Sequence, residues 1–505
     1  MPFAAEVSTG STSGGRAGAF AAEVSRRSLR DLLNQRGVAR VPSLRWSRQA
    51  RPAVVYRVPS LRRFRDGRCA TSSTSVGLRT GYRGDMGDFR GVLGLVFVLL
   101  LAVAFSKHRR GISWRTVGVA LGLQVAFALL VLRWGPGQDA MGWVSDRVES
   151  LIGYTQDGTE FVFGPLMAVG DENDTIFALQ VLPVIVFLGA LIGLLFYLRV
   201  IQWLAYLVGG TLSWLLQVSR IESLFAATVI FLGMSEAPLM IAPWLRSLRK
   251  GQVFTIMVGG FAAAAGSTLV GYSLLGAPLE YLLAATVMNA PASLLMAKIL
   301  WPDSTPADPD DEAEGVAPRD AEDIDVRTIR DEESRNAIDA LGRGALAGGR
   351  IAVTVGALLI AFIAAISMAN GILGGIGGWF GADDLTFEKV VGWAFAPLAW
   401  LLGVPWSEAV DAGSWIGQKT VLNEFVAYAD FGPQVDSLSG VTVAVVTFAL
   451  AGFANLGSIA ILIGTIGSLA PERRSWVAEL GLRALLAGSL ANLANAAIAG
   501  VVVSL

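Results

Sequence analysis

The sequence predicts an all-α polytopic membrane protein with about eight transmembrane helices and two re-entrant helical hairpins. Three observations predict this fold class. Hydrophobic residues make up 53% of the 505 residues and charged residues 16%, whereas soluble domains carry roughly 25% charged residues. From Gly91 onward, apolar runs recur that are long enough to span a hydrocarbon core of ~30 Å. Two further apolar stretches are interrupted by acidic turns, and these turns belong to a repeated arrangement.

The two acidic turns are the most informative feature of the chain. Residues 233–238 read Gly-Met-Ser-Glu-Ala-Pro, and residues 423–428 read Asn-Glu-Phe-Val-Ala-Tyr. A carboxylate without a partner is costly in hydrocarbon. Glu236 and Glu424 are therefore expected to face a polar cavity and to mark a substrate or ion path.

Each acidic turn is followed by a polar interruption of an apolar helix. These interruptions are residues 266–268, Gly-Ser-Thr, and residues 455–458, Asn-Leu-Gly-Ser. Ser267 and Asn455 each fall 31 positions after the glutamate of the preceding turn. Two copies of one arrangement are typical of a transporter built from internal repeats, with its site where the repeats meet.

Composition and rare residues argue against several other classes of protein. The net charge of −1 gives no global reason to expect a nucleic-acid partner. The single cysteine, Cys69, cannot form a disulfide framework or a cysteine metal site within one chain. The single histidine, His108, lies among basic residues between two apolar segments, as a solvated loop residue would. We therefore expect no metal site, no resident cofactor and no enzymatic activity.

Residues 1–85 differ from the rest of the chain. They are rich in Arg, Ser and Gly, lack a long apolar run, and repeat Arg-Val-Pro-Ser-Leu-Arg at 40–45 and 57–62. This composition predicts disorder. An arm that binds the phosphates of nucleic acid or anionic lipid is one interpretation. We favour another, in which Met86 is the natural start and the upstream stretch is an over-extended reading frame or a dispensable tail.

Eight spans are expected along the rest of the chain, near 91–105, 116–132, 176–198, 252–274, 279–300, 349–369, 441–466 and 480–503. The stretches 219–249 and 406–432 are apolar but contain Glu, Pro, Gly and Asn. We interpret both as re-entrant hairpins, because non-helical backbone at membrane depth survives only beside a cavity or buried in protein. Segments 138–153 and 386–404 are expected to be interfacial helices, the second with Trp393 and Trp400 at amphipathic spacing.

The basic loops predict the orientation. The loops richest in Lys and Arg are 107–115, 246–250 and 473–474, and such loops stay on the cytoplasmic side. Eight spans, with hairpins that return to the side they left, place all three loops inside and both termini outside. The strongly acidic loop 303–340 then also lies on the cytoplasmic side, where we interpret it as a solvated linker between two halves.

The hairpin tips and broken helices carry groups that suit a polar substrate. A half-helix that ends inside the membrane leaves backbone N–H or C=O groups unpaired, and these bind substrates or ions. A glutamate can accept hydrogen bonds from two hydroxyls at once, which suits a neutral polyhydroxylated ligand. Asn455 and Ser458, three apart on a helix, can complete a hydroxyl-binding cluster, and Phe453 offers an aromatic face. The alternative for Asn455 and Ser458 is a hydrogen-bonding role between helices.

Five motifs in order resemble the concentrative nucleoside transporter family over about residues 86–505. The motifs are 233–239, similar to the family's Gly-Gln-Thr-Glu-Ala-Pro-Leu, then 259–267, 423–428, 452–455 and 470–474. The resemblance implies a homotrimer that imports nucleosides by symport with sodium or protons. It places the protein in the lipid of the cell inner membrane, with no nucleic-acid partner. It also implies inverted repeats and a transport domain that moves across the membrane against a scaffold.

Six segments follow from the composition and the resemblance. They are the extension (1–85), the N-terminal scaffold helices (86–218), the first hairpin and broken-helix repeat (219–300), the acidic cytoplasmic linker (301–348), a scaffold helix with an interfacial helix (349–405), and the second hairpin and broken-helix repeat (406–505). The two hairpin repeats would form the transport domain.

Carried over by position, the resemblance implies two groups of substrate-binding residues. Those expected around the base are Gly233, Met234, Ser235, Glu236 and Thr268. Those expected to hold the ribose are Glu424, Asn455 and Ser458, with Phe453 beside them.

Two departures from the family concern the base and the coupling cation. Met234 and Ser235 stand where relatives usually have Gln and Thr. A methionine cannot make the paired contacts of an amide with a base edge, although its thioether can touch a ring. The sodium site of sodium-coupled members uses backbone carbonyls together with an Asn and a Ser side chain. Val229 and Ala263 stand at those two positions here.

The coupling cation is accordingly expected to be a proton in preference to sodium. Leu232 and Ala264 could still offer backbone carbonyls if a sodium site persists, but both side-chain ligands are absent. Glu236 is the proton candidate, because protonation neutralises the carboxylate for its passage through the membrane.

Three alternatives stay open on the sequence alone. One is a symporter of a nucleobase or another small polar metabolite, which the altered tip favours. A second is a membrane-embedded enzyme, weakened by the lack of a His, Cys or clustered Asp constellation in the spans. The third is a receptor or structural membrane protein, which would not need paired acidic hairpins.

Overall fold

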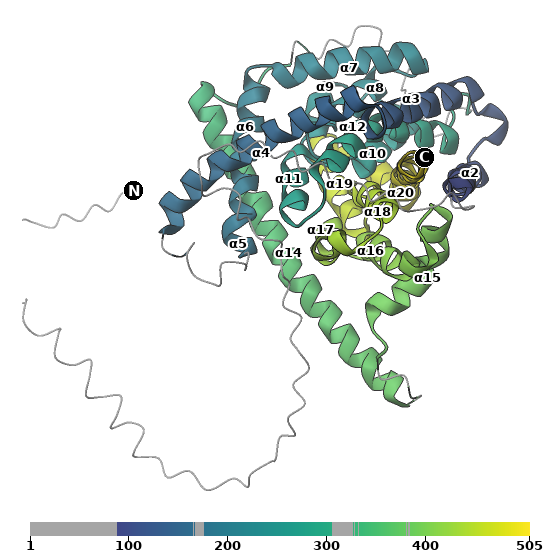
Figure 1. Ribbon diagram of the computed structural model, residues 1–505. Helices are drawn as coiled ribbons and strands as arrows, with labels where there is room; N and C mark the ends of the chain where they lie inside the picture. The colour runs from purple at the N-terminus through teal and green to yellow at the C-terminus, as the bar shows by residue number, and fades with distance from the viewer. Residues whose placement is uncertain are drawn as a thin grey trace, which may run out of the picture. The chain divides into compact units, whose positions relative to one another are not determined.

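The computed structural model describes residues 88–164, 166, 176–305, 327, 329–331, 333–379, 381 and 384–505. Within these residues all regular secondary structure is helical and no strand occurs (Figure 1), which confirms the predicted all-α class. The extension 1–85 and nearly all of the most acidic part of the loop (306–326) lie outside the described residues. The predictions made for those two stretches stay predictions.

The apolar runs form helices where spans were expected. The unbroken ones are α2 (Asp88–Ala104), α3 (Trp114–Leu132), α6 (Leu182–Tyr197, after the short α5, Phe177–Gln180), α12 (Leu279–Leu300), α14 (Ala337–Trp379) and α20 (Arg474–Ser504). Six helical stretches of the described chain are long and apolar enough to cross a membrane. Shorter apolar helices are α2, the α18–α19 pair and a helix over 200–216. α2 and the α18–α19 pair lie where the two remaining spans were predicted, and the chain is a multi-pass membrane protein.

Two of the spans are broken by short extended segments. Residues 263–265 separate α10 (Lys250–Ala262) from α11 (Gly266–Leu274), and residues 451–455 separate α18 (Gly440–Leu450) from α19 (Leu456–Leu469). In each span the second half-helix starts at the polar motif: α11 begins at Gly266, and α19 begins directly after Asn455. Asn455 is the N-cap of α19 and accepts from the backbone N–H of Ser458.

Both hairpins are present. The first contains α8 (Arg220–Thr228), an irregular tip, the 3-10 helix η3 (Ala237–Ile241) and α9 (Ala242–Leu245). The second contains η5 (Trp406–Glu408), α16 (Ala409–Val421) and α17 (Glu424–Phe431). The side chain of Asn423 starts α17 by accepting from the backbone N–H of Val426 at 2.9 Å. Each acidic turn therefore lies at a hairpin tip.

The bounds of two helices differ from the predicted ranges. α15 (Phe387–Leu401) fits the second interfacial segment, but α4 (Gly135–Phe163) is longer than 138–153. α14 extends beyond 349–369 at both ends and begins inside the stretch predicted as linker.

One helix, α7 (Val200–Leu216), was not predicted at all. It packs against α8 and exposes Trp203, Leu207 and Trp214 on its other side. The turn from α6 into α7 is made by Arg199 in the left-handed conformation (φ 64°). No Gly or Pro in the sequence signals this turn.

Among the described helices, α6 and α14 have the most extensive contact with each other, and small residues line it. Gly189 and Gly193 on α6 face Gly344 and Gly348 on α14. A β-carbon on Gly189 would lie 2.8 Å from the carbonyl oxygen of Gly344, so the two backbones are in direct contact. Membrane helices approach this closely only where small residues line the contact.

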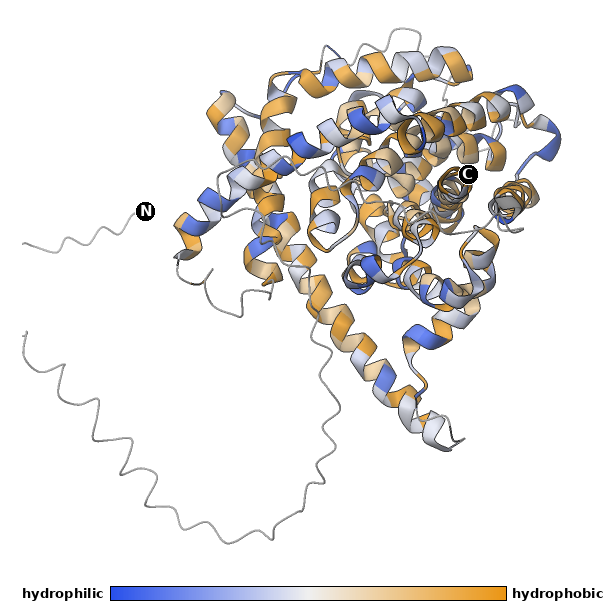
Figure 2. Cartoon of the chain, viewed as in Figure 1, coloured by the Kyte–Doolittle hydropathy of each residue, from blue (hydrophilic) through white to orange (hydrophobic). Residues whose placement is uncertain are grey.

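Away from α6, α14 is largely uncovered. Only 17% of the most apolar 18-residue stretch of this helix is buried. Val353, Ile360 and Met368 are exposed. Figure 2 shows this helix as hydrophobic along much of its length. A face of this kind is suited to contact with lipid or with another copy of the chain.

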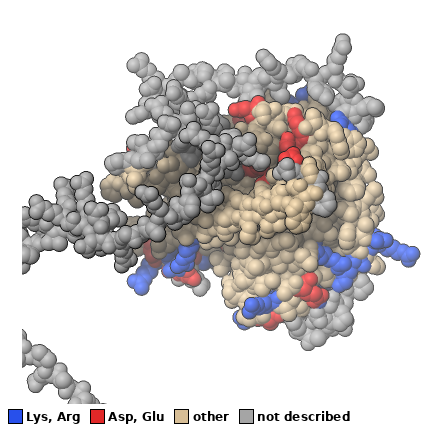
Figure 3. Space-filling view, turned by 90° about the horizontal axis from the view of Figure 1, so that it is seen from below, with Lys and Arg blue, Asp and Glu red and all other residues tan. Residues whose placement is uncertain are grey.

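The basic loops that were predicted to be cytoplasmic meet at one end of the helices. The Lys107 ammonium lies 3.7 Å from the ring centroid of Trp301, which packs on Phe254 near the start of α10. Arg246, on the loop before α10, pairs with Glu472 at the start of the last helical segment. Figure 3 shows one face of the molecule with its charged side chains in separate groups at the margins and an uncharged area between them.

Candidate functional site

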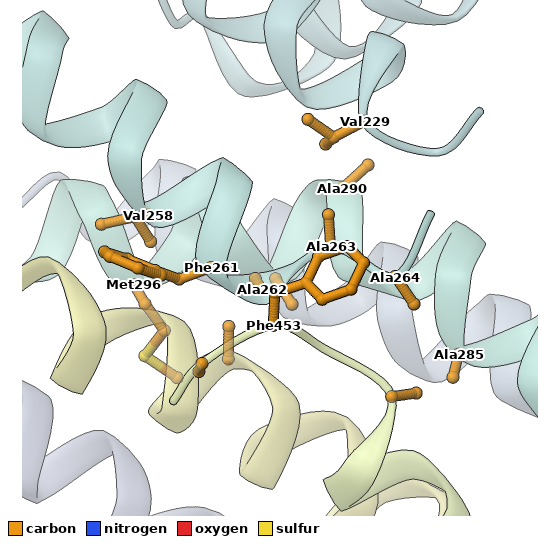
Figure 4. Close-up of a cluster of buried hydrophobic side chains, with 14 of the residues drawn as sticks. Val229, Val258, Phe261, Ala262, Ala263, Ala264, Ala285, Ala290, Met296 and Phe453 are labelled. Carbon is orange, nitrogen blue, oxygen red and sulfur yellow. The ribbon is translucent and has the colours of Figure 1, made fainter. Parts of the chain in front are cut away.

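The two broken helices touch at their extended segments. The backbone N–H of Phe453, in the second break, donates to the carbonyl oxygen of Ala263, in the first, at 3.0 Å. The Phe453 ring lies beside Ala263 (Figure 4). The place where the repeats meet is therefore built from backbone that is not helical, as expected for a polar site at membrane depth.

Buried asparagines hold both breaks in this form. Asn492 on α20 donates to the carbonyl oxygens of Ala262 at 2.9 Å and Ala451 at 3.2 Å. Asn289 on α12 donates to the same Ala451 oxygen at 2.7 Å, and its own Oδ1 accepts from Asn492 and Asn495. These carbonyls come at the ends of half-helices and lack helical partners, so the amides supply the hydrogen bonds that hydrocarbon cannot.

Glu424 is the centre of a hydrogen-bonded cluster at the tip of the second hairpin. Its side chain is 4% exposed. Oε1 accepts from the hydroxyl of Tyr272 on α11, and Oε2 accepts from Nδ2 of Asn455, each at 3.0 Å. Oδ1 of Asn455 accepts from the backbone N–H and the hydroxyl of Ser458, at 2.9 and 3.1 Å. The cluster thus joins the three residues expected at the ribose and adds Tyr272.

Glu236 has a different setting at the tip of the first hairpin. Its Oε2 accepts from the backbone N–H of Gly233 at 2.8 Å, and its side chain is partly exposed. Together with Leu232 and Ser267 it lines a cavity of about 980 Å³. The cavity lies between the first hairpin and the helices α6 and α14, and Trp244 also lines it.

The other residues expected at the base are divided between surface and core. Ser235 is exposed, whereas Met234 is 4% exposed and packs against Gly260 on α10. The Thr268 hydroxyl donates to the carbonyl oxygen of Ala265 in the break at 3.0 Å. Gly233 faces the same Ala265, since a β-carbon added there would lie 3.1 Å from the Ala265 methyl carbon.

The two positions at which the resemblance predicted the side chains of a sodium site are apolar. Val229 and Ala263 are each 2% exposed, and Figure 4 shows their side chains in a cluster of hydrocarbon with Ala264, Ala290 and Phe453. The Ala263 carbonyl oxygen is already occupied by the N–H of Phe453.

The two glutamates lie in different environments, and α11 links them. Ser267, in the first turn of α11, lines the cavity beside Glu236, and Tyr272, in its second half, reaches Glu424. The described structure contains no cluster of His, Cys, Asp and Glu that could hold a metal ion.

Sequence reasoning missed several residues of this region. Tyr272 donates to Glu424. Lys419 donates to Asn492, and Asn492 in turn donates to Asn289. The signal available was the presence of polar side chains inside otherwise apolar helices, which marks a cavity or a hydrogen-bonded core.

Known families match the described helices in consecutive stretches. The models described as "Na+ dependent nucleoside transporter N-terminus", "Nucleoside recognition" and "Na+ dependent nucleoside transporter C-terminus" match residues 93–166, 178–279 and 281–500.

Individual relatives agree with these models. The chain is 49% identical over 410 residues to the uncharacterized transporter YutK of Bacillus subtilis, which covers 81% of this chain and 98% of the relative. It is 40% identical over 423 residues to the nucleoside permease NupC of Helicobacter pylori, with 82% and 97% covered. Among solved structures it is similar to CNTnw in an inward-facing substrate-bound state. That match has a TM-score of 0.76 at 44% identity and covers 83% of this chain and 98% of that one. The chain belongs to the concentrative nucleoside transporter family.

Proposed function

We propose that this protein imports nucleosides by symport with a cation, and that the cation is a proton in preference to sodium. The Glu424 cluster is the observation that carries the substrate class. A buried carboxylate whose oxygens already hold one donor each keeps acceptor capacity for hydroxyl groups. Two relatives support the proposal by name: NupC is a nucleoside permease, and CNTnw has a solved state described as substrate-bound.

In this proposal the ribose binds to Glu424, Asn455 and Ser458, with Phe453 beside it. The base lies toward the first hairpin, among Gly233, Met234, Ser235, Glu236 and Thr268. Of these five residues, Glu236 lines the cavity of about 980 Å³, and small-molecule sites have volumes of about 300–1,000 Å³.

The apolar surroundings of Val229 and Ala263 support the choice of cation. Sodium needs several oxygen ligands to replace its water, and neither side chain offers one. Leu232 and Ala264 would contribute carbonyl oxygens to any remaining sodium site. Glu236 lines a cavity and can exchange a proton there, so it is the proposed coupling group.

We further propose an elevator movement within a homotrimer in the cell inner membrane, surrounded by lipid. The moving part would comprise residues 219–300 and 406–505, and the scaffold 86–218 and 349–405. The uncovered face of α14 supports the trimer, since it offers apolar surface for a second copy. Solved inward-facing, intermediate and outward-facing states of CNTnw support the movement.

A nucleobase substrate is the second candidate, and Met234 favours it. Competition experiments separate the two: uptake of labelled uridine into proteoliposomes should be inhibited by excess adenosine and cytidine and much less by uracil. Stronger inhibition by uracil than by the nucleosides would favour the nucleobase.

The Met234→Gln variant is expected to sharpen discrimination among bases. The amide restores a paired donor and acceptor at the hairpin tip, and a site built to hydrogen-bond a group rejects analogues that lack it. The measurement is the ratio of uptake rates for uridine, cytidine and adenosine. An unchanged ratio would show that position 234 does not face the base.

The Tyr272→Phe variant is expected to weaken ribonucleoside affinity by about tenfold, which corresponds to one hydrogen bond of about 1.4 kcal/mol. The ring should remain stacked on Tyr428, with centroids 4.5 Å apart, while Glu424 loses one donor. The affinity for 2′,3′-dideoxy analogues should change less. Tyr281→Phe is the matched control, because that ring packs on Phe448 away from the cluster. Equal losses in both variants would remove Tyr272 from the site.

A further inference from the structure

The helix α7 begins and ends at the same boundary of the membrane. It starts directly after α6, which is a predicted span, and it ends where two further spans begin. The hydroxyl of Thr116, in the first turn of α3, donates to the carbonyl oxygen of Leu216 at 3.2 Å. Just beyond α7, the hydroxyl oxygen of Ser219 accepts from Nε2 of Gln252, in the first turn of α10, at 3.4 Å. A helix whose two ends lie at one boundary runs along the membrane surface and does not cross it.

This boundary is the one predicted to be cytoplasmic. α3 follows the basic loop 107–115, and α10 starts at the end of the basic loop 246–250. Loops of this kind stay on the cytoplasmic side. The cytoplasmic leaflet contains anionic lipids, which attract basic residues close to the membrane surface.

One side of α7 is apolar and uncovered by the described part of the chain. Trp203, Leu207 and Trp214 are 56%, 67% and 78% exposed, whereas the opposite side of the helix packs on α8. Tryptophan rings prefer the headgroup level of a membrane, and leucine side chains at such a helix enter the acyl region. This face is therefore suited to contact with lipid.

Two guanidinium groups lie beside the same face. The guanidinium carbons of Arg220 and Arg327 are 5.1 and 4.2 Å from the ring centroid of Tyr206, on α7. That of Arg327 is also 5.2 Å from the ring centroid of Trp203. The rings of Trp203 and Tyr206 are in edge contact, with centroids 6.4 Å apart. Two positive charges are thus held next to an exposed indole.

The charge of Arg220 is not matched within the protein. Among the described residues Arg220 forms no ion pair, and its Nε–H has no acceptor there. Guanidinium groups bind phosphate well, because their forked N–H groups match the phosphate oxygens. Arg220 can therefore serve a phosphate group at the membrane surface.

We propose that α7 and the start of the first hairpin bind an anionic phospholipid of the cytoplasmic leaflet. The lipid phosphate accepts from the guanidinium groups of Arg220 and Arg327, and the acyl chains lie along Trp203, Leu207 and Trp214. Charge complementarity selects this occupant, because two guanidinium groups beside an exposed indole favour a negatively charged headgroup over a neutral one. Arg220 is the first residue of α8, so the lipid holds the base of the hairpin that carries the first acidic tip.

Lipid binding can be tested on the purified protein without any substrate. Phosphatidylglycerol added to the protein in neutral detergent is expected to raise the melting temperature by at least about 3 °C, because a ligand that binds only the folded state stabilises it. The same amount of phosphatidylcholine, whose headgroup has no net charge, should raise it by less than about half as much. The difference between the two lipids should shrink at high salt, which screens exposed charges.

Two arginine variants and a control assign the effect to the proposed surface. Arg220→Gln and Arg327→Gln should each lose at least about half of the stabilisation by phosphatidylglycerol. Arg335→Gln is the matched control, because it removes an exposed arginine from the same predicted side, and it should keep the full effect. If Arg220→Gln does not accumulate in membranes, Arg327→Gln carries the test, since Arg327 lies between α12 and α14 and not in either helix.

Three results would overturn the proposal. The first is equal stabilisation by both lipids, or the full phosphatidylglycerol effect in both arginine variants. The second is a shift with inorganic phosphate, at matched ionic strength, as large as that with the lipid, since the site would then take a soluble anion. The third is a Trp203→Ser variant that changes its oligomeric state but not its response to phosphatidylglycerol, which would place a second copy of the chain on α7. None of these measurements needs nucleoside transport, so they are decided independently of the proposed function.

Discussion

Replacement of Glu424 by glutamine is expected to weaken ribonucleoside affinity by about ten- to a hundredfold. The amide keeps the shape of the side chain but removes the charged acceptor, and a hydrogen bond to such an acceptor is worth about 1.5–3 kcal/mol. The loss should exceed that for Tyr272→Phe, because the carboxylate itself contacts the sugar in the proposed site. The affinity for uridine, measured by binding to purified protein or as the KM of uptake, checks this.

Analogues and a second glutamate control the experiment. The loss in Glu424→Gln should shrink for 2′,3′-dideoxy nucleosides, which lack the hydroxyls that the carboxylate would accept from. Glu408→Gln changes a carboxylate of the same hairpin that accepts from Ser439, and it should leave uridine affinity unchanged. If ribonucleosides and dideoxynucleosides lose affinity equally, Glu424 does not read the sugar.

Replacement of Glu236 by glutamine is expected to abolish the stimulation of uptake by a proton gradient. In the wild-type protein an inward proton gradient should stimulate uptake, and replacing sodium by choline should not affect it. The reason is that a protonated Glu236 carries no charge through the hydrocarbon, whereas an ionised one is costly there. Glutamine is permanently neutral, so the variant should exchange nucleoside across the membrane without concentrating it.

The ion requirement of the wild-type protein decides this interpretation. Uptake should be compared in sodium and in choline at constant pH, and then at several external pH values. A steep sodium requirement at constant pH would contradict proton coupling. It would also mean that the hydrocarbon around Val229 and Ala263 gives way to a cation site when sodium binds.

The spans, both hairpins and both acidic tips were predictable from the sequence, because all of them follow from the free-energy cost of placing polar groups in hydrocarbon. Hydrocarbon penalises unpaired polar groups so strongly that helix length and the position of each charge are visible in composition alone. Asn455 and Ser458 also contact each other, as their spacing predicted. Their role toward a sugar stays a prediction.

What the sequence did not reveal depends on contacts between distant segments. Tyr272 reaches Glu424 across 152 positions of the chain, and Asn492 reaches Ala262 across 230. No periodicity within one helix encodes such pairs. α7 was missed for a local reason, since Arg199 makes a left-handed turn that residues other than glycine rarely adopt.

The most direct test of the central claim is concentrative uptake of labelled uridine into proteoliposomes that contain the purified protein. With an inward proton gradient and no sodium, internal uridine is predicted to rise above the external concentration and to fall back when a protonophore is added. Uracil should not accumulate under the same conditions. Failure to concentrate uridine under either a proton or a sodium gradient, or accumulation of uracil in its place, would contradict the account.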